Sequence, residues 1–191
     1  MAEEQKPEAP AKSASHAPKP PPAAAVAPWV GELPESLKQQ FGDSVLEASV
    51  SLGQNCVAVR PESVIPVLEF LRFDKDFDYL VDLTAADYPQ RAERFDLVYI
   101  LYSFARNERI RVKTRITADQ QPESAVDVYL TANWLEREVF DMFGIRFTNH
   151  PDMKRILLPD EWQGHPLRKE TSILAMDNQW VKENLAIESG Q

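Results

Sequence analysis

Four side chains close together in the sequence could form a catalytic or metal site: Glu138, Asp141, His150 and His165. Glu138 and Asp141 are three residues apart in a predicted helix, so both carboxylates lie on one helix face. The two histidines could complete a metal site or act as an acid–base pair. However, neither histidine has a metal-ligand spacing such as HExxH, a proline follows each one, and Arg137 is placed to neutralise Asp141. A small metal-dependent enzyme is therefore an alternative hypothesis, not the leading one.

Other signatures of bound cofactors are missing from the sequence. It contains no Walker loop, no GxGxxG motif and no serine nucleophile elbow, and its six glycines offer little material for a phosphate-binding loop. Cys56 is the single cysteine, which excludes an internal disulfide and a CxxC cradle for zinc or an iron–sulfur cluster. It lies in an apolar stretch, and we expect it to be buried and unreactive. We therefore predict that this chain binds no cofactor and no metal itself.

Composition divides the chain and limits its partners. Residues 1–28 consist largely of Ala, Pro, Lys and Glu with one branched aliphatic residue, which predicts a disordered Ala/Pro-rich leader. The net charge of -9 disfavours binding to nucleic acid or to anionic lipid. The longest apolar run, residues 97–105, is far shorter than the roughly 20 residues of a membrane helix.

Residues 29–148 have the patterns of an α+β domain. Helical spacing predicts helices at 34–41, closed by Gly42, and from Pro61 to Arg72. Two strands, 45–51 and 56–60, flank Gly53 and predict a hairpin. Further strands are expected at 79–85, 95–104 and 109–117, and the apolar run at 95–104 predicts a central strand covered on both faces. We expect a two-layer domain with a mixed β-sheet and helices mainly on one face.

The strand at 109–117 alternates strictly between apolar and basic residues. Its basic face carries four cations: Arg109, Arg111, Lys113 and Arg115. Such a face could bind RNA, but the acidic total and the lack of interleaved aromatic residues argue against this second alternative. A solvated face or an ionic contact with another subunit fits better.

A helix starting near residue 133 carries three boundary signals. Asn133 is a favoured N-cap, Glu136 completes a variant of the capping box, and Gly144 suits the left-handed position after the last turn. The preceding segment, 119–132, is acidic and less regular. The sequence therefore predicts a short helix at the end of the domain.

Residues 149–191 are predicted to form an extended, partner-binding C-terminal arm. His-Pro occurs at 150–151 and 165–166, and cations follow each copy: Lys154, Arg155, Arg168 and Lys169. Large apolar residues are frequent, yet they have neither a helical nor a strand period: Ile156, Leu157, Leu158, Trp162 and Leu167. Apolar residues that do not gather on one face of a helix or strand suggest a segment that is ordered by a partner.

Three blocks of this region resemble one known family. They are WLEREVFDMFGI at 134–145, HPDMKRIL at 150–157 and WQGHPLRK at 162–169, and DLTAADYP at 82–89 adds a fourth. In order and spacing they resemble the 30-kilodalton subunit (the C subunit in bacteria) of respiratory complex I, the proton-translocating NADH:quinone oxidoreductase. The resemblance covers residues 29 to 170. Asn149 departs from the pattern, which leads us to expect Gly before His150.

The resemblance implies a role in assembly. Such subunits lie in the peripheral arm on the cytoplasmic side of the inner membrane and dock the quinone-site subunit, the 49-kilodalton or D subunit. They touch the membrane only through the complex. FMN and iron–sulfur clusters belong to other subunits, which carry electrons from NADH to quinone, so the isolated chain is expected not to be catalytic. Related membrane hydrogenases use a similar module, which leaves the electron donor and the quinone open.

We expect no nucleic-acid partner, and the interface candidates combine the aromatic, aliphatic and basic residues of the matching blocks. They are Trp134, Phe143, His150, Pro151, Arg155, Leu157, Trp162, His165, Pro166, Leu167 and Arg168.

Overall fold

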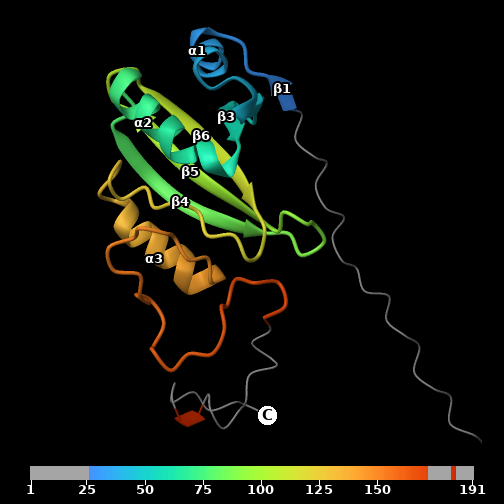
Figure 1. Ribbon diagram of the computed structural model, residues 1–191, viewed down its shortest axis with the longest axis vertical. Helices are drawn as coiled ribbons and strands as arrows, with labels where there is room; N and C mark the ends of the chain where they lie inside the picture. The colour runs from blue at the N-terminus through green and yellow to red at the C-terminus, as the bar shows by residue number, and fades with distance from the viewer. Residues whose placement is uncertain (1–25, 172–181, 184–191) are drawn as a thin grey trace, which may run out of the picture.

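The computed structural model describes residues 26–171 and 182–183, and Figure 1 shows their arrangement. Six strands form one sheet in the order β1-β2-β3-β6-β5-β4. The strands are β1 Val26–Pro28, β2 Val45–Ser51, β3 Gln54–Val59, β4 Tyr79–Asp87, β5 Phe95–Ser103 and β6 Glu108–Ile116. The helices are α1 Glu32–Phe41, α2 Val64–Asp74 and α3 Ala132–Phe143, with short 3-10 turns at η1 Gly42–Ser44 and η2 Pro61–Ser63. The β3–β6 pair is parallel and the other pairs are antiparallel, so the sheet is mixed, as predicted.

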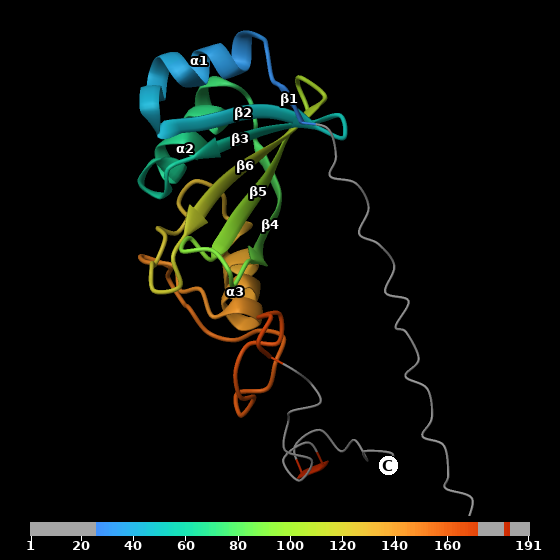
Figure 2. The same cartoon turned by 90° about the vertical axis from the view of Figure 1, so that its right-hand side faces the viewer.

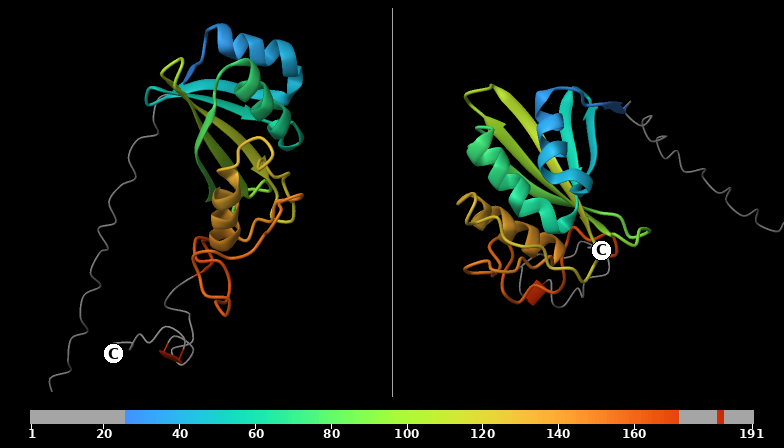
Figure 3. Two further views of the ribbon diagram at one scale, coloured as in Figure 1. Left: turned by 90° about the vertical axis from the view of Figure 1, so that its left-hand side faces the viewer. Right: turned by 45° about the horizontal axis from the view of Figure 1, so that its top comes forward.

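The three helices lie on one face of the sheet, which confirms the two-layer α+β prediction (Figures 2 and 3). Between the layers, the core is built from the alternate apolar residues of the strands and the inner stripes of the helices. Fully buried examples are Leu37, Val57, Leu68, Leu71, Leu97, Tyr99, Leu101, Ile110 and Val112. Among the described residues, no helix is both long enough and apolar enough to cross a bilayer.

The predicted hairpin is confirmed, since β2 and β3 pair in antiparallel fashion around Leu52 and Gly53. Within the described part of this chain, the strand predicted at 95–104 is covered on one face only, and not on both as expected. Leu97 and Tyr99 are fully buried on the helix side, but Val98 and Ile100 on the other side are only half-buried. The described helices cover one face only, so β5 has the alternation of a half-covered strand.

Helix α3 begins differently from the prediction. It starts at Ala132, with Thr131 in the N-cap position, and no side chain caps it. Asn133 lies inside the first turn, and Glu136 is fully buried instead of completing a capping box. The predicted end is confirmed: Gly144 adopts φ 75° and its N–H donates to the Phe140 carbonyl at 2.8 Å.

The outer segments differ from the predicted boundaries in one respect. Residues 1–25 of the predicted leader lie outside the described residues, but Val26–Pro28 form the edge strand β1, so the domain starts by residue 26. Residues 149–171, the described part of the C-terminal arm, form neither helix nor strand. The rest of the predicted arm lies outside the described residues, except for Lys182 and Glu183.

Candidate partner-binding surface

A buried carboxylate on α3 holds the start of the C-terminal arm. The Asp141 side chain is fully buried, and its Oδ2 accepts the backbone N–H groups of Ile156, Leu157 and Leu158 at 3.2, 2.9 and 2.9 Å. Its Oδ1 accepts a hydrogen bond from Arg155 Nη1 at 2.7 Å. Burial opposes ionisation, but these four donors outweigh it and lower the pKa of Asp141. The side chain is therefore an anion that fixes the irregular backbone at 156–158.

Arg137 does not pair with Asp141, which corrects the expectation from their four-residue spacing. Its guanidinium donates instead to the carbonyl oxygens of Lys154 and Arg155, at 3.1 and 3.2 Å, and lies 4.9 Å from the Trp134 ring centroid. These two bonds hold the backbone of residues 154–155, directly before the residues 156–158 that bond to Asp141. Arg155 takes the place that the spacing suggested for Arg137 because the arm brings it to the buried carboxylate.

The second His-Pro segment satisfies carbonyl groups at the end of α3. His165 Nδ1 donates to the Asp141 carbonyl at 2.9 Å, and the Leu167 N–H donates to Met142 at 3.1 Å. Arg168 Nε donates to the Phe143 carbonyl at 2.6 Å. The last carbonyls of a helix have no partner within the helix, so these bonds cap α3. Burial lowers the pKa of His165, which favours its neutral form.

The first His-Pro segment is held by the start of α3. The His150 side chain is fully buried, and its Nε2 donates to the Asn133 carbonyl at 3.1 Å while Nδ1 accepts the Asp152 N–H at 3.0 Å. Asn149 adopts φ 62°, a left-handed conformation that Asn tolerates better than most residues. Asn149 thereby adopts a backbone conformation that the expected Gly would also allow.

The end of the described arm meets the β4–β5 loop. The Lys169 N–H donates to Asp87 Oδ2 at 2.9 Å. Arg94 binds both oxygens of the same carboxylate at 2.7 and 2.8 Å, and also pairs with Glu170. The hydrogen bond from Arg94 is the main cause that holds the pKa of Asp87 below its ordinary value. The resulting cluster is formed by residues about 80 positions apart in the sequence.

While its backbone is bonded to α3, the arm exposes large apolar side chains. Leu157 and Leu167 are 60% and 51% exposed, and Trp134 on α3 is 63% exposed. Pro151 is also exposed, whereas Trp162 and Pro166 are half-buried. Polar contacts therefore order the segment while leaving Leu157 and Leu167 exposed. We name Trp134, Leu157 and Leu167 the exposed apolar set.

Phe143 differs from the other interface candidates. It is only 6% exposed and packs edge-to-face on Phe95, with the ring centroids 6.4 Å apart. It belongs to the core of this chain, so it cannot act as a surface anchor without moving. Helical spacing could have separated it from Trp134, because residues nine apart lie on opposite sides of a helix.

The alternative metal site is not assembled. Glu138 is exposed, Asp141 is bonded to Arg155 and the arm backbone, and His150 and His165 each bond to a different backbone carbonyl. Within residues 26–171 and 182–183, no three His, Cys, Asp or Glu side chains are placed to hold a metal ion. Asp141, His150 and His165 instead attach the arm to α3.

Comparisons with known proteins show the family of this chain. Residues 57–176 match the family described as "Respiratory-chain NADH dehydrogenase, 30 Kd subunit". A protein of Ruegeria pomeroyi, named as the C subunit of NADH-quinone oxidoreductase, is 47% identical over 141 residues, covering 73% of this chain and 70% of that protein. A protein of the same name from Trichlorobacter lovleyi is 48% identical over 138 residues, 71% of this chain and 85% of that protein. The chain belongs to this family of 30-kilodalton subunits.

A solved structure has the same fold. It is a chain of the membrane-bound sulfane sulfur reductase, an archaeal respiratory membrane complex, with a TM-score of 0.66 and 23% identity. The match covers 81% of this chain and 90% of the other. The same arrangement of sheet and helices therefore occurs in a second kind of respiratory complex.

Proposed function

We propose that this chain is a cofactor-free subunit of the peripheral arm of a proton-translocating NADH:quinone oxidoreductase, on the cytoplasmic side of the inner membrane. Its role is to hold the quinone-reducing module together by docking the quinone-site subunit, the 49-kilodalton or D subunit. Electrons pass from NADH through FMN and iron–sulfur centres of other subunits to quinone. Family membership and the names of the relatives support this proposal.

The observation that carries the docking proposal is the exposure of Trp134 on α3 and of Leu157 and Leu167 on the arm, whose backbone is already ordered. A preordered segment loses little conformational freedom on binding, so contacts made by its exposed side chains contribute more of their energy to affinity. Large aromatic and aliphatic groups of this kind commonly anchor interfaces. The arm thus presents apolar anchors at a small ordering cost.

The other interface candidates of the arm differ in exposure. Pro151 is exposed, and Trp162 and Pro166 are half-buried. Arg155 and Arg168 are bonded to α3 and are half-buried, so they position the arm. Asp141 neutralises Arg155, so Arg168 is the one of the two that supplies positive charge near the contact. Such charges set orientation more than affinity. His150 and His165 act on the inner side, where they attach the arm to α3.

Leu157→Asp and Leu167→Asp test the proposal, with Leu52→Asp as the matched control. Leu52 is 84% exposed at the tip of the β2–β3 hairpin, so its replacement makes the same chemical change away from the arm. Each variant is expressed in a strain that lacks the native chain. Co-purification of the D subunit and NADH:quinone reductase activity of the membranes are then measured.

With the arm variants, the amount of co-purified D subunit is expected to fall tenfold or more, and the activity by a comparable factor. The reason is that burying a carboxylate without a partner weakens binding by several kcal/mol, on the order of the cost of an unpaired buried charge. The control is expected to match the unmodified chain. Circular dichroism of the purified variants checks that the domain remains folded. Wild-type assembly in both arm variants would overturn the docking proposal.

A further inference from the structure

The face of the sheet opposite the helices carries two parallel rows of side chains. Register pairing places Val98 opposite Lys113, Ile100 opposite Arg111 and Tyr102 opposite Arg109. The apolar row on β5 is half-buried. The four cations of β6 form the neighbouring basic row: Arg109, Arg111, Lys113 and Arg115. An apolar row beside a basic row makes this face amphipathic.

One end of the basic row is neutralised within the chain and the other is not. Asp96 pairs with Lys113 at 3.1 Å, with Arg115 at 3.9 Å, and also with Arg91. Arg111 makes no ion pair within the described part of the chain, and its Nε is buried without a hydrogen-bond partner there. A buried N–H without a partner is unfavourable, so an acceptor supplied by another molecule would stabilise Arg111 Nε.

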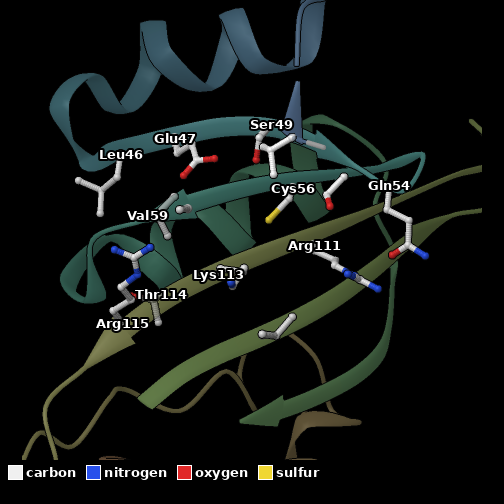
Figure 4. A pocket seen from close by; sticks show the side chains of 14 residues that line it. Leu46, Glu47, Ser49, Gln54, Cys56, Val59, Arg111, Lys113, Thr114 and Arg115 are labelled. Carbon is white, nitrogen blue, oxygen red and sulfur yellow. The ribbon is translucent and has the colours of Figure 1, made fainter. Parts of the chain in front are cut away.

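A hollow of about 320 Å³ lies beside Arg111 on the same face (Figure 4). Side chains of β2, β3, β5 and β6 line it, and its apolar lining includes Leu46, Ala58 and Val98. Gln54 Oε1 also borders the hollow and is a second buried polar atom without a partner among the described residues. The single cysteine, Cys56, lies in the hollow and is half-buried rather than fully buried, and burial raises the pKa of its thiol.

A solvated sheet face is the simplest alternative, because antiparallel sheets often leave one face to water. Such faces normally carry polar residues at the outward positions. Here Asp96 is the one charged outward residue of β5, and Val98, Ile100 and Tyr102 follow it on the same face. Two neighbouring polar atoms are buried without partners in the described part of the chain. These features fit a face that is covered in the assembled state.

We propose that this face is covered by an acidic amphipathic helix of a neighbouring subunit. Alternate residues of a strand lie roughly 6.6–6.8 Å apart, close to the roughly 6 Å between residues four apart on a helix. A helix with carboxylates at that spacing can follow the basic row while its apolar stripe covers the apolar row. One carboxylate reaches Arg111, which, like Arg109, has no ion pair with an acid among the described residues.

Charge supports this occupant over nucleic acid. The chain as a whole carries a net charge of -9, so a polyanion would be repelled by the rest of the surface. A single helix contacts only the basic row and the strand beside it. The proposal rests on the chain being a subunit, but it concerns a face opposite the helices and does not depend on the identity of the subunit that the C-terminal arm binds.

The test places a photo-crosslinking amino acid at Ile100 in the assembled complex, with a second variant carrying it at Leu157 in the arm. Crosslinked peptides are identified by mass spectrometry. At Ile100, we expect a peptide of another subunit that is helical, with carboxylates three or four residues apart. Arg111→Gln and Arg111→Glu are expected to reduce this crosslink fivefold or more, whereas Lys38→Glu, an exposed cation on α1, leaves it unchanged.

The two crosslinking positions separate the two proposals. Loss of the crosslink at Leu157 alone would count against the proposed arm contact and leave the sheet-face proposal standing. At Ile100, the absence of any protein crosslink would overturn the sheet-face proposal. So would a crosslink to RNA, to a second copy of this chain or to a segment without acidic residues.

Discussion

Asp141 in α3 and Arg155 in the C-terminal arm form a charge-assisted hydrogen bond of 2.7 Å around a fully buried carboxylate. The same carboxylate accepts three consecutive backbone N–H groups. One side chain thus replaces the hydrogen bonds that a helix or strand would supply to residues 156–158. An irregular segment can be ordered in this way, provided that the carboxylate remains ionised.

Asp141→Asn should release the arm while leaving the domain folded. The substitution removes the charge and places an amide NH2 against the N–H donors of the arm. Losing hydrogen bonds to a charged group lowers the stability of the closed arm by roughly 2–4 kcal/mol. Opening of the arm should increase by about 100-fold, since about 1.4 kcal/mol corresponds to a factor of ten. The measurement is the rate of trypsin cleavage after Lys154 and Arg155, which follows the open population. Glu138→Gln, an exposed carboxylate on the same helix, is the control, and equal cleavage rates in the two variants would contradict the prediction.

Gly144→Ala should destabilise the chain more than Gly53→Ala does. Both glycines have similar positive φ angles, 75° and 72°, so both substitutions strain the backbone by a similar amount. A Cβ at Gly144 would lie 2.5 Å from the His165 ring and 2.8 Å from Arg168 Nη2, whereas a Cβ at Gly53 meets nothing within 4 Å. We expect about 1 kcal/mol of destabilisation at Gly53 and an additional 1–3 kcal/mol, roughly, at Gly144. Urea unfolding measures the stability of both variants. Equal losses of unfolding free energy would contradict the prediction and show that the His165 side chain moves aside without cost.

Glu136 should make stability fall as pH rises. Burial raises its pKa to about 7, although the Ser124 hydroxyl and the Ala125 N–H oppose the shift. Between pH 4.5 and 7 the folded chain keeps this proton while the unfolded chain loses it, so stability decreases through that window and levels off above it. The decrease is on the order of 3 kcal/mol. Glu136→Gln, which retains a donor and an acceptor, should gain this amount over the unmodified chain at pH 8 and nothing at pH 4. Parallel pH profiles of unfolding free energy would refute the assignment.

Arg94→Lys should weaken the cluster at the end of the arm. A lysine cannot reproduce the bidentate hydrogen bonding to Asp87, whose side chain is fully buried. We expect a loss of about 2–3 kcal/mol in urea unfolding and faster hydrogen exchange at the Lys169 amide. Arg106→Lys, on an exposed turn residue, should change stability by less than about 0.5 kcal/mol. If the two variants were equally stable, the bidentate Arg94–Asp87 contact would make no net contribution to the free energy of unfolding.

Local patterns predicted the sheet well because they act over a few residues. The alternation at 109–117, the turn at Gly53 and the left-handed Gly144 each require a particular neighbour or φ angle, and each is found where expected. The failures involve contacts across the chain. Asn133 and Glu136 have the spacing of a capping box, but Ser124 and Ala125 offer Glu136 partners in the core.

The attachment of the arm had only partial signals in the sequence. Arg137 and Asp141 fit a pair at helical spacing, yet the arm supplies Arg155 to Asp141 and backbone carbonyls to Arg137. Asp87 lies in one of the recognised blocks, but its partners Arg94 and Lys169 lie at very different distances along the chain and could not be chosen from spacing. Only the folded structure shows which charged side chains pair with each other.

The parallel pairing of β3 with β6 has a consequence for synthesis on the ribosome. Residues 55–58 of β3 bond to residues 110–113 of β6, so the edge of the first hairpin stays unpaired until some fifty further residues have left the exit tunnel. The meander β4-β5-β6 closes through short turns and can form quickly, whereas joining it to β3 requires a long loop to close. A nascent chain stalled before residue 108 would expose that edge, and the two halves become one sheet only after β6 has emerged.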